Sequence, residues 1–243
     1  MEDYKTTFLP LLLKANALSF GTFTLKSGRV SPWFFNSGKL SSRPLTKALG
    51  EAFATVLSSP PFALPFGTED SEDGADADGK FRPVFDVLFG PAYKGIPMAG
   101  IVVSHLPENG RFDDVNYSFN RKEVKDHGEG GAIGGAPLKG KKVCIIDDVL
   151  TAGTALREAV SIIKAQGGEV VGVVLLLTRQ ERVSDNEPRS ALKVAEDDLG
   201  VPVRAVLTFQ DLIDAIQLGK IEGVGGKELA EMEKYRELYG SKD

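Results

Sequence analysis

Two segments of the chain are apolar at almost every position, and they constrain the fold more than any other feature. Residues 143–146 read Val-Cys-Ile-Ile, and residues 170–177 contain only valine, leucine and one glycine. A half-exposed strand alternates apolar and polar side chains, whereas a strand that is apolar on both faces belongs in a parallel sheet covered on both sides. Helical periodicity lies between these runs. The sequence therefore predicts an α/β fold with a central, mainly parallel sheet flanked by helices.

The remaining periodicities place other elements around this sheet. Pro44 suits the first turn of a helix, and Thr208 and Asp211 have the spacing of a capping box. Further strands are predicted at 85–89 and 203–207, with short strands on either side of a turn at Ser27-Gly28. The predicted helices are 4–18, 44–56, 95–105, a segment that ends at Gly167-Gly168, one that ends near Gly219, and 227–239.

Composition excludes several classes of protein. The net charge of −5 argues against a general nucleic-acid surface, which normally belongs to a basic domain. The single cysteine, Cys144, excludes an internal disulfide, and its apolar neighbours predict a buried side chain. The opening Met1-Glu2-Asp3 lacks the basic region of a signal peptide, and no apolar run is long enough to span a membrane. We therefore expect a cytoplasmic protein.

Residues 67–80 are the one segment of biased composition. They contain six acidic residues and almost no apolar side chains, so they cannot bury enough surface to fold. A calcium loop is an alternative. However, placing Gly79 at the invariant glycine of an EF-hand puts Gly74 at the first ligand position and Phe85 at the last. We expect a disordered acidic insert at the surface.

The most specific motif begins where the first apolar run ends. Asp147 and Asp148 are followed by a turn of small and hydroxyl residues, Thr151 to Thr154, that opens a helix. Backbone N–H groups in such a turn can close on a phosphate, and the helix N-terminus adds positive potential. Adjacent carboxylates would repel that phosphate, so we expect them to bind vicinal sugar hydroxyls and to lie near a hydrated Mg²⁺. The alternative is a turn aspartate and a threonine that simply caps the helix.

Residues 143–155 resemble the phosphoribosyl pyrophosphate signature of the type I phosphoribosyltransferases. Residues 135–141 match another phosphate motif, G-x-x-x-x-G-K, but Lys142 stands where serine or threonine is required, and the predicted strand follows the motif instead of preceding it. The resemblance implies that the whole turn contacts the sugar-phosphate donor: Asp147, Asp148, Val149, Leu150, Thr151, Ala152, Gly153, Thr154 and Ala155.

Four other segments resemble the orotate phosphoribosyltransferases and occur in that family's order. They are residues 23–36, 89–97, 117–131 and 177–181, and the resemblance spans residues 4–220. It implies one type I phosphoribosyltransferase domain over 1–243, with a small N-terminal hood at 1–40 and a flexible catalytic loop at 117–136. The implied activity is Mg²⁺-dependent transfer of a phosphoribosyl group to orotate, which yields orotidine 5′-monophosphate and pyrophosphate in pyrimidine biosynthesis.

The segment 121–127 carries the local positive charge that an anion site needs. Arg121, Lys122, Lys125 and His127 lie within seven residues, and glycines follow. A solvated charged loop is the alternative. The resemblance implies a lid whose cations stabilise the negative charge that grows on departing pyrophosphate, while the closed lid excludes water. It also implies a homodimer in which Lys122 reaches the neighbouring site.

The resemblance assigns the remaining roles in the two substrate sites. Arg179 would pair with the orotate carboxylate, because a planar guanidinium binds a carboxylate through two hydrogen bonds. An exposed ion pair is the alternative for this arginine. Trp33 stands where the family has a tyrosine, and we expect no role for it in the chemistry. The implied donor contacts are Lys26, Tyr93 and Lys94, and the implied base contacts are Lys26, Phe34, Phe35 and Thr151. Burial in the core is the alternative for Phe34 and Phe35.

Two other functions are compatible with the donor motif. Transfer to a purine base would leave Arg179 without a carboxylate to bind. A non-catalytic regulator could keep the phosphate turn as a sensor, but it would dispense with the cationic lid and usually carry a DNA-binding module.

Overall fold

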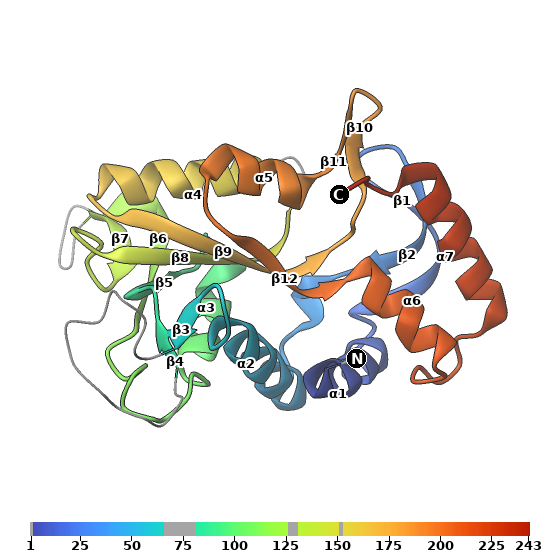
Figure 1. Ribbon diagram of the computed structural model, residues 1–243, viewed down its shortest axis with the longest axis horizontal. Coiled ribbons are helices and arrows are strands. Elements are labelled where there is room, and N and C mark those ends of the chain that lie inside the picture. The colour runs from blue at the N-terminus through green and yellow to red at the C-terminus, as the bar shows by residue number, and fades with distance from the viewer. Residues whose placement is uncertain (1, 66–80, 126–130, 151–152) are drawn as a thin grey trace.

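The computed structural model describes residues 2–65, 81–125, 131–150 and 153–243 (Figure 1). Its centre is a six-stranded sheet of β5 (Val87–Phe89), β6 (Asn116–Lys125), β7 (Gly131–Gly135), β8 (Lys142–Val149), β9 (Glu169–Thr178) and β12 (Val203–Thr208). The strand order is β12-β9-β8-β5-β6-β7, and every neighbouring pair is parallel except β6 with β7. The predicted mainly parallel sheet is confirmed.

Helices cover both faces of this sheet. On one face lie α4 (Thr154–Ala165) and α5 (Ala191–Leu199), and on the other lie α2 (Arg43–Leu57) and α3 (Gly95–Val103) (Figure 1). Side chains of β8 alternate between the two layers. Val143 and Ile145 pack in the cluster that contains the buried face of α4, whereas Cys144 and Ile146 pack in the cluster that contains α2 and α3. The predicted burial of Cys144 is confirmed.

A second group of elements extends the larger of these two cores. It consists of α1 (Asp3–Lys14), β1 (Leu18–Thr24), β2 (Val30–Phe35), the short 3₁₀ helix η1 (Ser37–Lys39), α6 (Phe209–Gln217) and α7 (Gly226–Tyr239). β1 and β2 form an antiparallel hairpin, as predicted, and α7 packs against β2. The capping box is confirmed, because Thr208 Oγ1 accepts the Asp211 N–H at 3.1 Å and Asp211 Oδ2 accepts the Thr208 N–H at 2.8 Å. Within the described ranges, no helix has the length and apolar character needed to cross a bilayer.

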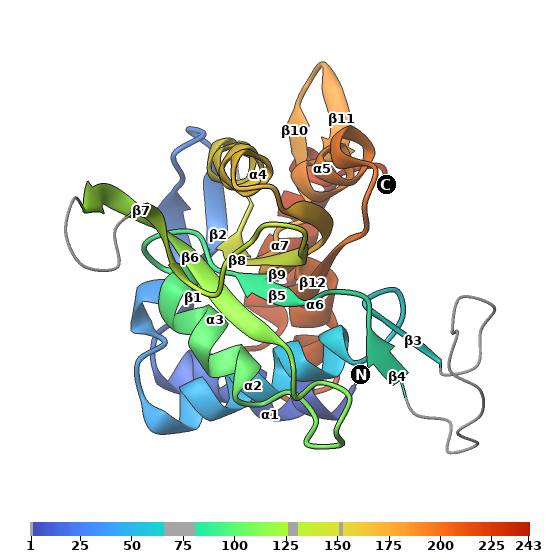
Figure 2. The same cartoon turned by 90° about the vertical axis from the view of Figure 1, so that its left-hand side faces the viewer.

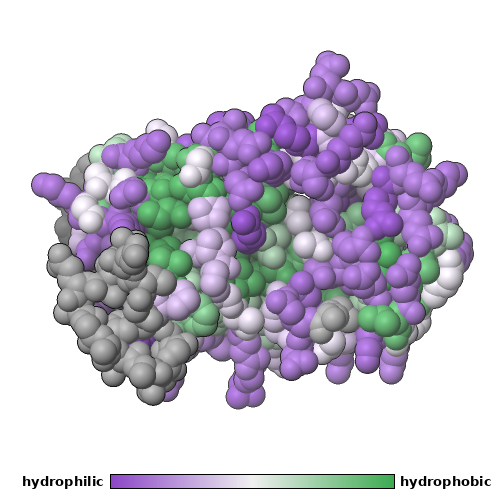
Figure 3. All heavy atoms as spheres, in the orientation of Figure 1, coloured by the Kyte–Doolittle hydropathy of each residue, from purple (hydrophilic) through white to green (hydrophobic). Residues whose placement is uncertain are grey.

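Two short hairpins were not predicted. β3 (Ala63–Pro65) pairs with β4 (Phe81–Pro83) on either side of the acidic insert, whose residues 67–80 lie outside the described ranges. β10 (Arg182–Ser184) pairs with β11 (Glu187–Ser190) in a hairpin that projects from the molecule in both cartoon views (Figure 2). On the face shown in Figure 3, hydrophilic side chains gather over this projection.

The segment 117–136 differs from the loop that the sequence led us to expect. Residues 116–125 and 131–135 form β6 and β7, which pair antiparallel from Ser118 with Gly135 to Lys125 with Gly131. Tyr117 and Phe119 alternate with polar residues, and this two-residue period is typical of a strand. The predicted loop rested on the charged residues that follow, and this period was overlooked. Most of the predicted loop 117–136 is therefore strand in this structure, and residues 126–130 lie outside the described ranges.

Candidate active site

The carboxyl ends of β5, β8 and β9 meet at one edge of the sheet. The chain proceeds from β5 to β6 on one side and from β8 to β9 and β12 on the other, so the strand order reverses between β5 and β8. In open α/β sheets, ligands bind in the crevice outside the carboxyl ends at such a switch point. Lys94 follows β5, Asp147 and Asp148 lie at the end of β8, and Arg179 follows β9. The topology therefore gathers predicted site residues from three segments.

Asp148 is the centre of a polar network that spans the switch point. Its Oδ2 accepts a hydrogen bond from Lys94 Nζ at 2.8 Å and another from the Ser37 hydroxyl. The Asp148 side chain is 14% exposed and that of Lys94 is 62% exposed, so the ammonium group reaches the carboxylate from the solvent side. Asp147 Oδ1 accepts the backbone N–H of Asp148 at 2.9 Å, which fixes the two acids relative to each other.

The two adjacent carboxyl groups differ in proton affinity. Burial, together with the charge of Asp148, raises the pKa of Asp147 to about 6. Burial acts in the same direction on Asp148, but the hydrogen bonds from Lys94 and Ser37 outweigh it and lower the pKa of that carboxyl below its usual value. Asp148 is therefore ionised at neutral pH. The pKa of Asp147 lies close enough to neutral pH for a nearby charge to change its protonation state.

Two glycines shape the turn that carries Tyr93 and Lys94. A Cβ added to Gly90 would lie 2.0 Å from the carbonyl oxygen of Gly95, and one added to Gly95 would lie 2.6 Å from the carbonyl carbon of Gly90. Both obstacles are backbone atoms, so neither position has room for a side chain. Asn120 Oδ1 on β6 also accepts a backbone N–H of this turn at 2.8 Å. The rigid turn presents Tyr93 with 71% of its surface exposed.

The turn between β8 and α4 leaves the start of the helix open. Gly153 precedes α4 with a φ of +72°, in the left-handed region, and contributes no capping side chain. Thr151 and Ala152 lie outside the described residues, so the alternative in which Thr151 caps the helix stays untested. Among the described residues, no side chain caps the first-turn N–H groups of α4, which is the arrangement that an anion site needs. Of the other predicted contacts, Val149 and Leu150 are half-buried, and Thr154 and Ala155 are exposed.

Arg179 is held in one orientation by β2 and by the loop that follows β9. Its Nε donates to Glu181 Oε1 at 2.6 Å, and its Nη2 donates to Ser31 Oγ at 2.8 Å. The guanidinium carbon lies 3.9 Å from the centroid of the Trp33 ring. The Arg179 side chain is 15% exposed. It does form an ion pair, but not the exposed and weak kind that was the alternative.

The predicted base contacts from the β1–β2 hairpin differ in exposure. Phe34 is 39% exposed and stacks on Phe23, with ring centroids 5.4 Å apart. Phe35 is half-buried and packs against the larger core. The core alternative therefore fits Phe35 better than Phe34. Lys26 is exposed in the turn between β1 and β2.

The cationic segment is described in part. Arg121 is half-buried on β6. Lys122 Nζ lies 3.9 Å from Glu158 Oε1 on α4, and the two side chains are 41% and 52% exposed. The backbone of Lys125 ends β6 opposite Gly131. The side chain of Lys125 and all of His127 fall outside the described parts of the chain.

The acids at the switch point suit a cation that is held mainly by its ligand. In the described part of the chain, no cluster of three or more His, Cys, Asp or Glu residues is arranged to hold a metal ion. Asp147 and Asp148 supply two carboxylates, and Lys94 already engages one of them. Mg²⁺ usually keeps several waters and binds through one or two carboxylates plus substrate phosphates. The residues present fit that mode of binding, and not a closed protein cage.

The sequence analysis gave no role to several residues that orient the predicted ones. Trp33, for which we expected no role in the chemistry, lies against Arg179, and Ser31 and Glu181 bond to the same guanidinium. The position of Glu181 two residues after Arg179 was a usable signal. No sequence signal joins Ser37 to Asp148, which is 111 positions away.

Comparisons with known proteins agree with this geometry. Residues 76–198 match the Phosphoribosyl transferase domain family. Orotate phosphoribosyltransferase of Coccidioides immitis (strain RS) is 52% identical, and that of Stenotrophomonas maltophilia (strain K279a) is 46% identical; each alignment covers 99% of this chain and 98% of the relative. The crystal structure of orotate phosphoribosyltransferase from Francisella tularensis superposes with a TM-score of 0.75 at 34% identity and covers 96% of this chain and 99% of that one. The chain therefore belongs to the orotate phosphoribosyltransferase family and has the type I phosphoribosyltransferase fold.

Proposed function

We propose that this chain works in the cytoplasm and transfers the phosphoribosyl group of phosphoribosyl pyrophosphate to orotate. The products are orotidine 5′-monophosphate and pyrophosphate. The contact between Lys94 and Asp148 carries the proposal, because it joins a cation from the turn after β5 to a carboxylate at the end of β8, at the switch point. Membership in the family over the full chain supports the choice of orotate as the acceptor.

The donor would bind along the turn after β8. Its 5′-phosphate would accept hydrogen bonds from backbone N–H groups at the start of α4, where the helix dipole favours negative charge. Asp147 and Asp148 would accept hydrogen bonds from the ribose hydroxyls, and the lowered pKa of Asp148 keeps it an acceptor at neutral pH. These contacts hold C1′ in place while its bond to pyrophosphate breaks.

The reaction moves charge in a direction that the surrounding cations favour. The bond from C1′ to pyrophosphate oxygen breaks with its electron pair, N1 of orotate forms the new bond to C1′, and the N1 proton is lost. Positive groups aimed at the departing pyrophosphate lower the barrier. When bound, Mg²⁺ would supply further positive charge beside Asp147 and Asp148. The proposed cationic groups are Lys26, Lys94, Arg121, Lys122, Lys125 and His127, with Tyr93 as a further donor contact.

Arg179 would select the acceptor base. Its guanidinium is already oriented by Glu181, Ser31 and Trp33, so binding a carboxylate needs little reorganisation. Phe34 would border the pyrimidine from its exposed position on β2. Phe35 and Thr151 are the further base contacts that we propose. A purine has no carboxylate for Arg179, so the orientation of this side chain favours orotate over the purine alternative.

The same reaction offers a test of the proposed homodimer. We propose that Lys122 acts in the site of the partner subunit, and Lys122 is exposed in this chain. Mixing inactive Lys122→Ala and inactive Asp148→Asn proteins under conditions of subunit exchange would then restore part of the activity, because one site of each mixed dimer is intact. Activity that stays at the level of the separate variants would contradict the shared site.

The activity itself is tested by following the loss of orotate absorbance. We expect turnover only when phosphoribosyl pyrophosphate and Mg²⁺ are both present, and we expect adenine, guanine and hypoxanthine to be inert. Addition of pyrophosphate to orotidine 5′-monophosphate would regenerate orotate. Purine turnover without orotate turnover would overturn the proposal in favour of the alternative acceptor.

A further inference from the structure

Glu181 is a nearly buried carboxylate on which three segments converge. Its side chain is 12% exposed. Oε1 accepts hydrogen bonds from Arg179 Nε at 2.6 Å and from the Tyr235 hydroxyl at 2.9 Å, and Oε2 accepts one from Arg29 Nη1 at 3.1 Å. The turn before β2, the loop after β9 and helix α7 therefore meet at a single acidic group.

These contacts decide which edge of the Arg179 guanidinium is open. Glu181 occupies Nε, and Ser31 occupies one N–H of Nη2. The Tyr235 hydroxyl also lies close enough to interact with the guanidinium. Among the described residues, the two hydrogen bonds that place this group use Nε and Nη2, so Nη1 and the second N–H of Nη2 are left to bind a ligand. The Nη1–Nη2 edge therefore remains as the one that can bind a carboxylate through two parallel hydrogen bonds. The Trp33 ring, 3.9 Å from the guanidinium carbon, closes one face of the group.

The net charge around Glu181 also favours a carboxylate as the ligand. Arg29, Arg179 and Glu181 together carry one excess positive charge in a part of the molecule where each side chain is 16% exposed or less. A carboxylate that binds at the open edge would neutralise that excess. Without Glu181, two poorly solvated guanidinium groups would be left without their shared counter-ion, a costly arrangement that favours reorientation.

The backbone between Arg179 and Glu181 is held as firmly as the side chains. Gln180 has a φ of +48°, an uncommon value for a residue other than glycine. Its carbonyl oxygen accepts the Ser241 N–H at 2.9 Å, and its Oε1 accepts the Gln210 N–H at 2.8 Å. Contacts from α6 and from the segment after α7 therefore fix the direction in which both flanking side chains leave the loop.

We infer that Glu181 is a positioning residue for recognition of the base: it holds Arg179 so that the Nη1–Nη2 edge faces the carboxylate of orotate, and Tyr235 holds Glu181. The inference rests on the proposed function, in which Arg179 binds that carboxylate. Burial and the nearby Glu181 raise the pKa of Tyr235 to about 12, so its hydroxyl remains a hydrogen-bond donor at physiological pH.

The test compares two nucleotides that differ only in the base carboxylate. Calorimetry would measure the affinities of orotidine 5′-monophosphate and uridine 5′-monophosphate for the wild type, Glu181→Gln and Tyr235→Phe. We expect Glu181→Gln, which removes the charged partner of Arg179, to weaken binding of orotidine 5′-monophosphate by about 10-fold or more. We expect Tyr235→Phe, which removes one hydrogen bond from a neutral donor, to weaken it by about 3-fold. Binding of the second nucleotide and the KM for phosphoribosyl pyrophosphate should stay unchanged in both variants.

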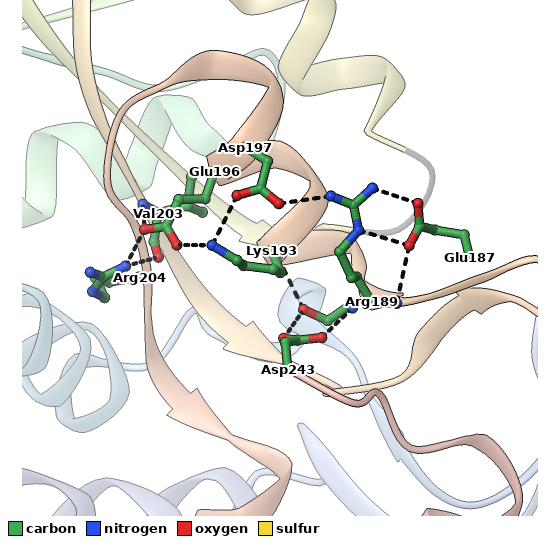
Figure 4. Close-up of polar contacts among 9 residues, drawn as sticks. Glu187, Arg189, Lys193, Glu196, Asp197, Val203, Arg204 and Asp243 are labelled. Carbon is green, nitrogen blue, oxygen red and sulfur yellow. Dashed lines mark hydrogen bonds and ion pairs between the residues drawn. The ribbon is translucent and has the colours of Figure 1, made fainter.

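A matched control lies in the neighbouring hairpin. Glu187 Oε2 accepts a hydrogen bond from Arg189 Nη2 at 2.6 Å, in a more exposed pair that does not touch Arg179 (Figure 4). We expect Glu187→Gln to leave both nucleotide affinities unchanged.

Each outcome separates the inference from the function on which it rests. If Glu181→Gln lowered the affinity for both nucleotides equally, or left the affinity for orotidine 5′-monophosphate unchanged, the positioning role would be overturned. A wild type that binds the two nucleotides equally would instead refute the assignment of Arg179. If Glu181→Gln lacks a cooperative unfolding transition, the Tyr235→Phe result decides, because that change removes only a hydroxyl group.

Discussion

The two ends of the candidate site are built in different ways. The proposed donor end comes from the end of β8 with the turn after it and from the turn after β5, and the hydrogen bond from Lys94 to Asp148 joins them. The base end is assembled around Arg179 by β2, the loop after β9 and α7, and its partner Ser31 lies 148 positions away in the sequence. Local backbone N–H groups suffice to hold a phosphate, whereas recognition of a planar carboxylate needs an oriented side chain. That orientation comes from tertiary contacts.

The largest expected effect tests the donor end. We expect Asp148→Asn to lower kcat by roughly 100- to 1000-fold, as when one preorganised electrostatic group is lost from an active site. The KM for orotate should change little, because the base end does not depend on this carboxylate. Steady-state kinetics with each substrate varied in turn would check this. A rise in the KM for orotate without a fall in kcat would show that the two ends of the site do not act separately.

The next effect tests the base end. We expect Arg179→Ala to weaken orotate binding by about 10- to 100-fold, the range for charge-assisted hydrogen bonds, with the KM for phosphoribosyl pyrophosphate unchanged. Arg189→Ala is the matched control, since Arg189 pairs with Glu187 and Asp197 on a more exposed surface (Figure 4). Calorimetry that finds orotate affinity unchanged in Arg179→Ala would remove this residue from the base site.

The same contrast explains what the sequence could and could not predict. The uniformly apolar runs that form β8 and β9, and the capping box at Thr208 and Asp211, depend on neighbouring residues and were predicted correctly. The predicted N-terminal helix, 4–18, extends past the observed end at Lys14. The chain leaves the helix there, and Asn16 adopts a φ of +52°. Local sequence patterns predict local structure, but they do not predict single residues with unusual dihedral angles.

Long-range partners were beyond prediction for a physical reason. The hydroxyl of Ser37 and the carboxylate of Asp148 meet only because β2, η1 and β8 are packed in one fold. Similarly, the sequence showed Glu181 next to Arg179 but gave no indication that Tyr235 and Arg29 would share it. Helix α5 was also missed; Ala195 is its one buried residue, and Leu192 and Leu199 are only partly buried against the core.

A smaller effect concerns stability at the donor end. The raised pKa of Asp147, about 6 in the folded protein against the ordinary 3.8, means that the folded state binds this proton more tightly than the unfolded state. The contribution of this group to stability is thus present at low pH and is lost as the pH rises through 6. We expect Asp147→Asn to be more stable than the wild type by about 1–3 kcal/mol at pH 8. That gain should shrink toward zero near pH 4.

Urea denaturation of both proteins across this pH range would measure the difference. A gain that does not depend on pH would show that titration of Asp147 is not its cause. Activity should fall in the same variant, which would identify the donor end as a place where function opposes stability.

The smallest effect is expected outside both ends of the site. Deletion of residues 68–79 should leave kcat and both KM values unchanged. Pro65 on β3 pairs with Phe81 on β4, so the chain enters and leaves this insert at adjacent points, and a shorter connection can join them. A deletion protein that folds but is inactive would show that the acidic insert contributes to the reaction.

The strand that delivers the two acids also limits how the chain can change in length. Val143 and Ile145 face one layer of helices, and Cys144 and Ile146 face the other. One residue gained or lost within 142–146 would exchange these faces and turn Asp147 and Asp148 to the wrong sides of the sheet. The number of residues in this strand is therefore constrained as strictly as their identity, and insertions or deletions that preserve activity must fall outside residues 142–146.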